Sequence, residues 1–144
     1  MQKSMKMAID WSETPIQVKG SWSTIEIHLA HIQLVNPLNG NKGGSWRGRA
    51  KRAKLHRNFA YLSTKAEIFG KDLSGPLVVT ITRVSSGTLD DDALPASAKH
   101  VRDGIADALG VKDNDPRVAW RYKAEKCKRG TWAAHITISR AEKT

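Results

Sequence analysis

Cysteine is almost absent from this chain of 144 residues, in which Cys127 is the single one. One cysteine cannot build an internal disulfide framework or a zinc site made of several thiolates. No run of apolar residues approaches the roughly 20 that a membrane span needs, and residues 1–10 lack the apolar core of a signal peptide. We therefore expect a cytoplasmic protein with no membrane partner.

Acidic residues are also scarce, with 14 Asp and Glu against 24 Lys and Arg and a net charge of +10. Such a charge favours a polyanionic partner, although it does not specify a fold. The acids are unevenly placed, since half of them fall in residues 90–115, among only three basic residues. A strongly basic chain thus contains one acidic island.

The first half of the chain predicts one strand and one long helix. From Thr24, apolar and polar residues alternate as in a strand, and the alternation slips near His31, which indicates a bulge or bend. Residues 36–44 are rich in Asn and Gly and predict a loop. A helix is expected from Trp46 to about Phe69, with a rough apolar stripe made of Ala50, Ala53, Leu55, Ala60 and Ile68.

The second half predicts the rest of a mixed sheet. Residues 77–84 are dense in β-branched residues and form the clearest strand. Residues 95–109 predict a helix that ends at Gly110, and residues 118–122 and 131–139 predict a closing antiparallel pair. The expected fold is α+β, in the order strand, helix, strand, helix, strand, strand. We expect a single domain over residues 1–144, with 1–23 as a weakly ordered arm or a peripheral strand.

Asp90 and Asp92 are the first candidates for chemistry. On an extended segment their carboxylates point to the same side while that of Asp91 points away. Two close carboxylates repel unless a cation intervenes, and Mg²⁺ prefers such oxygen ligands. Asp115, just before the next strand, is the best third ligand. The alternative is a solvated acidic turn.

Lys99 and Asp103 share one face of the second helix, four residues apart. Their spacing favours a surface ion pair. In the alternative interpretation, Lys99 leans into the acidic site towards a phosphate, and Asp103 orients it.

A basic segment precedes the acidic island. Seven cations and no acid lie in residues 42–57, where they could follow a phosphate backbone or form a solvated face: Lys42, Arg47, Arg49, Lys51, Arg52, Lys54 and Arg57. Lys123, Lys126, Lys128 and Arg129 form a second, smaller basic group.

Three stretches of the second half carry a resemblance: Leu89-Asp90-Asp91-Asp92-Ala93-Leu94, then the helix with Lys99 and Asp103, then Asn114-Asp115-Pro116-Arg117-Val118. Together they resemble the RusA family of Holliday junction resolvases over roughly residues 77–140. The first half matches that family only in outline, through its strand, Asn-rich loop and basic helix. Ala93 departs from the family's usual asparagine, and Asn114 from a frequent aspartate.

The resemblance implies that Asp90, Asp92 and Asp115 bind Mg²⁺, or Mn²⁺ in its place, and that Lys99 is the essential lysine. It further implies a homodimer from a phage or prophage that nicks four-way DNA junctions in pairs, without an organic cofactor. The main alternative is a non-catalytic DNA-binding protein of the same fold. An RNA-binding module is a third possibility, but the exposed aromatic pattern of an RRM-type sheet is lacking.

Overall fold

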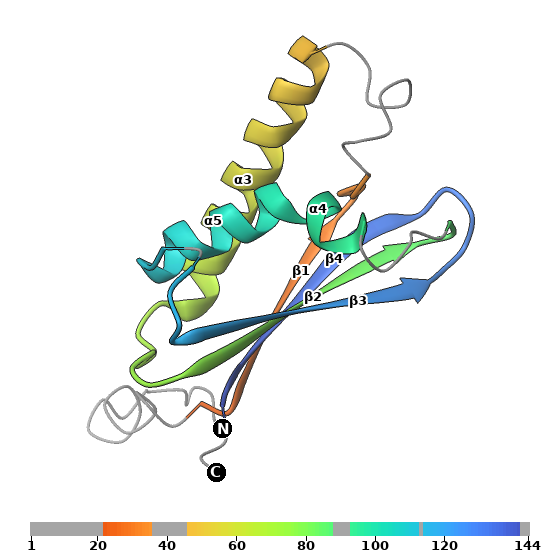
Figure 1. Ribbon diagram of the computed structural model, residues 1–144. Coiled ribbons are helices and arrows are strands. Elements are labelled where there is room, and N and C mark those ends of the chain that lie inside the picture. Colours follow the sequence, from red (N-terminus) through yellow and green to blue (C-terminus); the bar gives the residue numbers. More distant parts are fainter. Residues whose placement is uncertain (1–21, 36–45, 88–92, 113, 142–144) are drawn as a thin grey trace, which may run out of the picture.

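The computed structural model describes residues 22–35, 46–87, 93–112 and 114–141. In them, four strands form one mixed sheet in the order β1-β4-β2-β3, with the helices packed on it (Figure 1). The elements are β1 (Thr24–Ala30), α3 (Trp46–Ile68), β2 (Leu77–Ser85), α4 (Ala93–Ser97), α5 (Lys99–Leu109), β3 (Val118–Lys126) and β4 (Trp132–Arg140). The predicted α+β fold and its element order are confirmed. Residues 1–21 of the predicted arm lie outside the described residues.

Alternating side chains give the sheet one buried face, against which the helices pack. Ile25, Ile27 and Leu29 of β1 are buried while the residues between them are exposed. β2 and β4 add Val79, Ile81, Ile136 and Ile138 to the same core, and α5 adds Val101 and Ile105 from above. The expected bend after β1 is confirmed at His31, whose φ is 62°.

β2 occupies a central position in the sheet. It pairs in parallel with β3, from Leu77 opposite Val118 to Ser85 opposite Lys126, and antiparallel with β4. The predicted antiparallel pairing of residues 118–122 with 131–139 is therefore wrong, because β2 lies between them. Its β-branched residues suit a strand that is paired on both edges. The β3–β4 connection crosses two strand spacings, about 10 Å, which a few residues can span.

The second predicted helix is split into two pieces at Ala98, which has φ −98° and ψ 4°. α5 ends as expected at Gly110, which is left-handed with φ 72° and whose N–H donates to the carbonyl oxygens of Ala106 and Asp107. None of the described helices combines the length and the apolar character needed to cross a bilayer.

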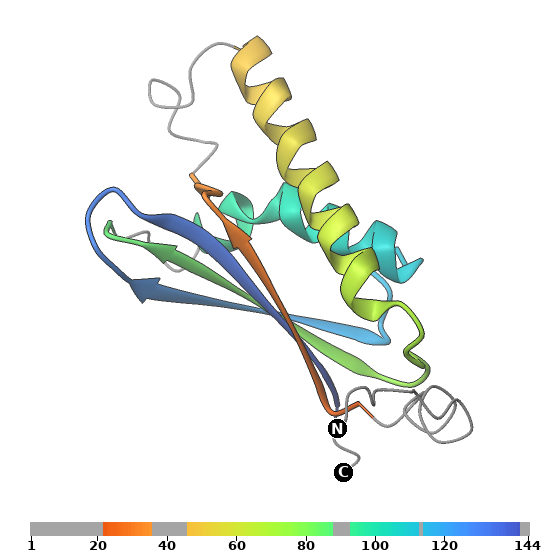
Figure 2. The ribbon, with the colours of Figure 1, turned by 180° about the vertical axis from the view of Figure 1, so that it is seen from behind.

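α3 lies across α5 and projects beyond the sheet at its amino-terminal end (Figure 2). The two helices approach closely at Gly104 of α5. A Cβ added there would lie 2.9 Å from Ala60 Cβ, 3.0 Å from the backbone nitrogen of Tyr61 and closer still to the carbonyl oxygen of Arg57. The absence of a side chain at Gly104 is thus what allows this contact between helices.

The buried face of α3 differs from the expected stripe. It consists of His56, Ala60, Thr64 and Ile68, whereas Leu55 is 59% exposed. The prediction that Leu55 belongs to the core is wrong, because small and polar residues fill the narrow space beside α5.

Candidate nucleic-acid interface and acidic site

The predicted metal ligands Asp90 and Asp92 lie outside the described residues, but the flanks of their segment are described. The chain leaves β2 through Ser85, Ser86 and Gly87, and the N–H of Gly87 donates to Ser85 Oγ over 3.2 Å. We call these three residues the β2 exit. The chain is described again from Ala93, the first residue of α4.

A buried arginine fixes the β2 exit. Arg83 Nε donates to the carbonyl oxygen of Leu34 over 3.0 Å, and its Nη1 donates to that of Gly87 over 3.3 Å. Arg83 is 8% exposed, and burial lowers the pKa of its guanidinium. It ties the end of β2 to the chain that follows β1. Arg83 was not among the predicted site residues, although it falls on the same alternating, inward-facing positions of the strand as Val79 and Ile81.

Exposed cations lie beside the β2 exit. Lys126 is paired with Ser85 in the sheet, and the N–H of Cys127 donates to the carbonyl oxygen of Ser85 over 3.2 Å. Lys126, Lys128 and Arg129 are all exposed. Three of the four members of the smaller basic group found in the sequence therefore follow the point from which the Asp90–Asp92 segment departs, while Lys123 lies further back, opposite Thr82 of β2.

The predicted contact between Lys99 and Asp103 is confirmed. Lys99 Nζ lies 3.0 Å from Asp103 Oδ2, and the two side chains are 64% and 15% exposed. Lys99 is the first residue of α5, at the end that adjoins α4, and α5 runs from there back towards the start of β3 (Figure 1). Its catalytic role stays a prediction, since an ion pair of this kind also occurs on ordinary helix surfaces.

Asp115 lies near the start of β3, far from the β2 exit. Its Oδ1 accepts a hydrogen bond from the Arg117 N–H over 2.8 Å, and the Arg117 carbonyl oxygen accepts one from Leu77, the first residue of β2. The nine residues of β2 span about 26 Å from that point to Ser85. Lys99 and Asp115 are separated by α5, whose 11 residues span about 16 Å.

In the part of the chain that the structure describes, no three His, Cys, Asp or Glu side chains group closely enough to hold a metal ion. Asp115 offers a carboxylate, which is a suitable Mg²⁺ donor, but one of its oxygens already supports the turn before β3. The three-carboxylate site therefore stays a prediction, and the geometry of a single chain brings Asp115 no closer to the β2 exit.

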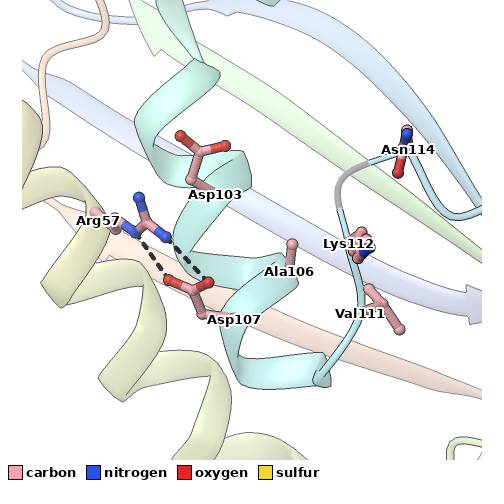
Figure 3. Close-up of a pocket in the computed structure, with 7 residues that line it drawn as sticks. All are labelled: Arg57, Asp103, Ala106, Asp107, Val111, Lys112 and Asn114. Atoms are coloured by element: carbon pink, nitrogen blue, oxygen red, sulfur yellow. Dashed lines mark hydrogen bonds and ion pairs between the residues drawn. The ribbon is translucent and has the colours of Figure 1, made fainter.

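An open polar cavity of about 440 Å³ lies between α3, α5 and the connection that leads to β3 (Figure 3). Asp107 accepts two hydrogen bonds from Arg57, at 2.8 and 3.1 Å, and this partner raises the pKa of Arg57. Asp103, Lys112 and Asn114 complete the polar part of the lining. Because both α5 carboxylates already have a cation partner, this cavity is not an acidic site.

The predicted basic helix presents its cations on different sides. Arg47, Lys51 and Lys54 are exposed and share one flank of α3, since they are three or four residues apart. Arg49 and Arg52 are half-buried beside His56 and His100. Of the remaining two, Arg57 is paired with Asp107, and Lys42 lies outside the described residues.

Lys65 belongs to the exposed flank as well. It lies eleven residues, or three turns, beyond Lys54 and is exposed. Within the described ranges no carboxylate lies within ion-pair distance of Lys51, Lys54 or Lys65. We call Arg47, Lys51, Lys54 and Lys65 the basic flank. Lys65 was not among the predicted DNA-binding residues because it lies beyond the dense cluster, although helical spacing could have included it.

His56 is buried between α3 and α5, and its pKa is lowered to about 4, first by burial and then by Arg52 and His100. Burial also lowers the pKa of His100. The two histidines line a small pocket of about 40 Å³ with Arg49 and Arg52. At neutral pH His56 is uncharged, which suits a position within the helix interface.

Comparison with protein-family models gives no match for this chain, and a search of the curated proteins gives no relative either.

Proposed function

We propose that this protein is a Mg²⁺-dependent, structure-selective endonuclease of the RusA type that resolves four-way DNA junctions. The observation that carries the proposal is the position of Lys126, Lys128 and Arg129 beside the β2 exit, from which the Asp90–Asp92 segment departs. Carboxylates that bind a metal and cations that hold a phosphate backbone are the two requirements of metal-assisted phosphodiester hydrolysis.

Asp90 and Asp92 are the proposed Mg²⁺ ligands, with Mn²⁺ as a substitute, and Asp115 is the proposed third. Bound Mg²⁺ would activate water and stabilise the leaving oxygen. Lys99 would place a positive charge near the scissile phosphate, where negative charge develops in the transition state. Asp103, which lies 3.0 Å from Lys99 Nζ, is the residue that would hold it in position.

The basic flank of α3 would bind DNA through its phosphates. Its four cations lie along one side of a 23-residue helix, so they can follow a phosphate backbone without reading sequence. A homodimer suits this substrate, because a four-way junction has two equivalent strands to cut. Such an enzyme would act in the cytoplasm of a bacterial host.

A second candidate is a non-catalytic DNA-binding protein of the same fold. The separation between Asp115 and the β2 exit favours it, because a nuclease site in a single chain would then have two carboxylates. The exposed cations of α3 and of the β3–β4 turn serve either candidate equally.

The experiment compares labelled four-way, Y-shaped and linear DNA, with Mg²⁺, with Mn²⁺ and without metal. We expect the wild type to nick four-way junctions with either metal, and Asp90→Asn, Asp92→Asn and Lys99→Ala to bind but not cut. Asp91→Asn is the matched control, since the adjacent Asp91 is predicted to point away and should keep cutting.

Asp115→Asn decides the role of the third carboxylate. Loss of cutting with retained binding would support Asp115 as a ligand, whereas full cutting would remove it from the site. Binding of junctions without nicking in either metal would replace the enzyme by the second candidate.

A further inference from the structure

An exposed apolar strip runs along α3 on the side away from the core. Leu55 and Leu62 are 59% and 64% exposed, Phe59 is 37% exposed, and Phe69, the first residue after α3, is 86% exposed. Ala66, between Leu62 and Phe69, is exposed as well. We call these five residues the α3 strip. Isolated exposed apolar residues are ordinary, but a continuous row of leucine and phenylalanine on one helix face marks an interaction surface.

The spacing of the strip is that of a coiled-coil seam. Its members are separated by four, three, four and three residues, which is the alternation of the two apolar positions in a heptad. The buried residues His56, Ala60, Thr64 and Ile68 lie on the opposite side of the same helix. α3 therefore has one face packed in its own chain and a second face with the pattern of helix–helix contact.

The exposed apolar area of the strip can be compared with that of known interaction surfaces. Its large side chains expose roughly 500 Å² of apolar surface, in the range of about 300–600 Å² given for the largest patch of a typical monomer. A shallow groove of about 450 Å³ runs beside it and is lined also by Lys51, Lys54 and Asn58. The aliphatic stems of those lysines border the strip, which by itself is smaller than the roughly 800 Å² per partner of a standard protein interface.

We propose that the α3 strip is the contact between two copies of this chain, which pair antiparallel about a two-fold axis at Leu62. In that register Leu62 meets its own copy, Leu55 faces Phe69, and Phe59, three residues before the axis, lies next to the small side chain of Ala66, four residues after it. The strip is thus self-complementary, as a two-fold interface requires, with its largest and smallest members next to each other.

Charge selects the antiparallel direction. A parallel pair would bring the Arg47, Lys51 and Lys54 cations of both copies to the same end, within one interhelical spacing of about 8–10 Å. The antiparallel pair separates the two Lys51 residues by about 33 Å along the helix axis, so the repulsion is largely screened by salt. Of the basic flank, only the two Lys65 residues come within about 9 Å of each other along the axis, and the other cations stay further apart beside the seam.

This interface is the dimer contact of the proposed nuclease. It follows from the α3 surface alone, and its test uses no DNA. Sedimentation equilibrium of the full chain over a wide concentration range is expected to show a dimer. Leu62→Glu should raise the dimer dissociation constant more than about a hundredfold, because two unpaired carboxylates would meet at the axis. Ala50→Glu adds the same charge on another side of α3 and should leave the dissociation constant within about threefold of wild type.

Two further measurements fix the register. A mixture of Leu62→Glu and Leu62→Lys chains should recover a heterodimer, because the residue meets its own copy. In a Cys127→Ser background, mixed Leu55→Cys and Phe69→Cys chains should form a mixed disulfide, whereas a parallel pair would give disulfides between like chains.

A wild type that stays monomeric, or a dimer that Leu62→Glu leaves intact while circular dichroism shows the variant folded, would overturn the proposal. Disulfides between two Leu55→Cys chains would overturn the antiparallel register. Each result is independent of DNA cleavage, so the dimer contact and the nuclease activity can fail separately.

Discussion

From the contact between α3 and α5 we predict that replacing Gly104 by alanine destabilises the protein, whereas the same change elsewhere in a helix usually stabilises it. Gly104 lies inside α5, where replacing glycine by alanine ordinarily stabilises a helix by about 1 kcal/mol. Here the new methyl group would meet Ala60 Cβ at 2.9 Å and the backbone of Arg57 and Tyr61 as well. Backbone atoms cannot rotate away as a flexible side chain can, so the two helices would have to separate.

The expected cost follows from two opposing effects. Overpacking of a well-packed contact costs about 1–3 kcal/mol and occasionally more, and the helix-propensity gain returns about 1 kcal/mol of it. Because the clash includes backbone, we place Gly104→Ala at the upper end, with a net loss of about 2 kcal/mol in the free energy of unfolding. In a domain of this size that corresponds to a fall in Tm of roughly 4–8 °C.

Urea denaturation followed by circular dichroism measures this loss directly. Gly48→Ala is the matched control, since Gly48 is an exposed glycine in the first turns of α3, and we expect it to be neutral or slightly stabilising. If Gly104→Ala were as stable as wild type or more so, the close approach of the two helices would be refuted.

Three further predictions concern single groups or a single surface. The pKa of His56 is about 4 in the folded protein, below its ordinary 6.5, so the free energy of unfolding should be complete above pH 6.5 and fall by up to about 3 kcal/mol as the pH drops towards 4. Urea titrations of wild type and His56→Gln at several pH values in that range test this. An equal fall in the free energy of unfolding with pH in the two proteins would contradict it. Arg83→Met should cost about 1–3 kcal/mol, because two backbone carbonyls lose their donor, and an unchanged urea midpoint would argue against that role. Replacing Lys51, Lys54 and Lys65 together by alanine should flatten the salt dependence of junction binding by up to about 2.7 in log–log slope, measured by fluorescence anisotropy. An unchanged slope would show that DNA binds elsewhere.

The strands could be predicted because each one carries its own signal. The alternation of Ile25, Ile27 and Leu29 with polar residues gives β1 directly, and the β-branched run gives β2. The order in which the strands pair in the sheet could not be predicted in the same way. The pairing depends on which strand lies in the middle of the sheet. Strands that follow each other in sequence usually pair, which favoured a β3–β4 pair, but β2 lies between β3 and β4.

The faces of α3 show why hydrophobicity alone misassigns a helix. The extent of the helix was predicted to within one residue, but its larger apolar side chains, such as Leu55 and Leu62, lie outside. The inner face must be narrow where Gly104 approaches, so Ala60 and Thr64 occupy it. At these positions the short distance to α5 limits the size of the side chain, so small residues are buried there even though larger apolar residues are available on the same helix.

The acidic site illustrates the limit of reasoning from spacing along the chain. Asp115 precedes a strand and the Asp90–Asp92 segment follows one, which suggests proximity if the two strands run antiparallel. β2 and β3 are parallel, so the beginning of β3 lies beside the beginning of β2 and the β2 exit lies at the other end. What the fold does bring to that exit is Lys126 and the cations after it, a neighbourhood that no spacing in the sequence indicated. The phosphate-binding part of the proposed site therefore has more structural support than its third carboxylate, and Asp115→Asn is the variant whose behaviour is most informative.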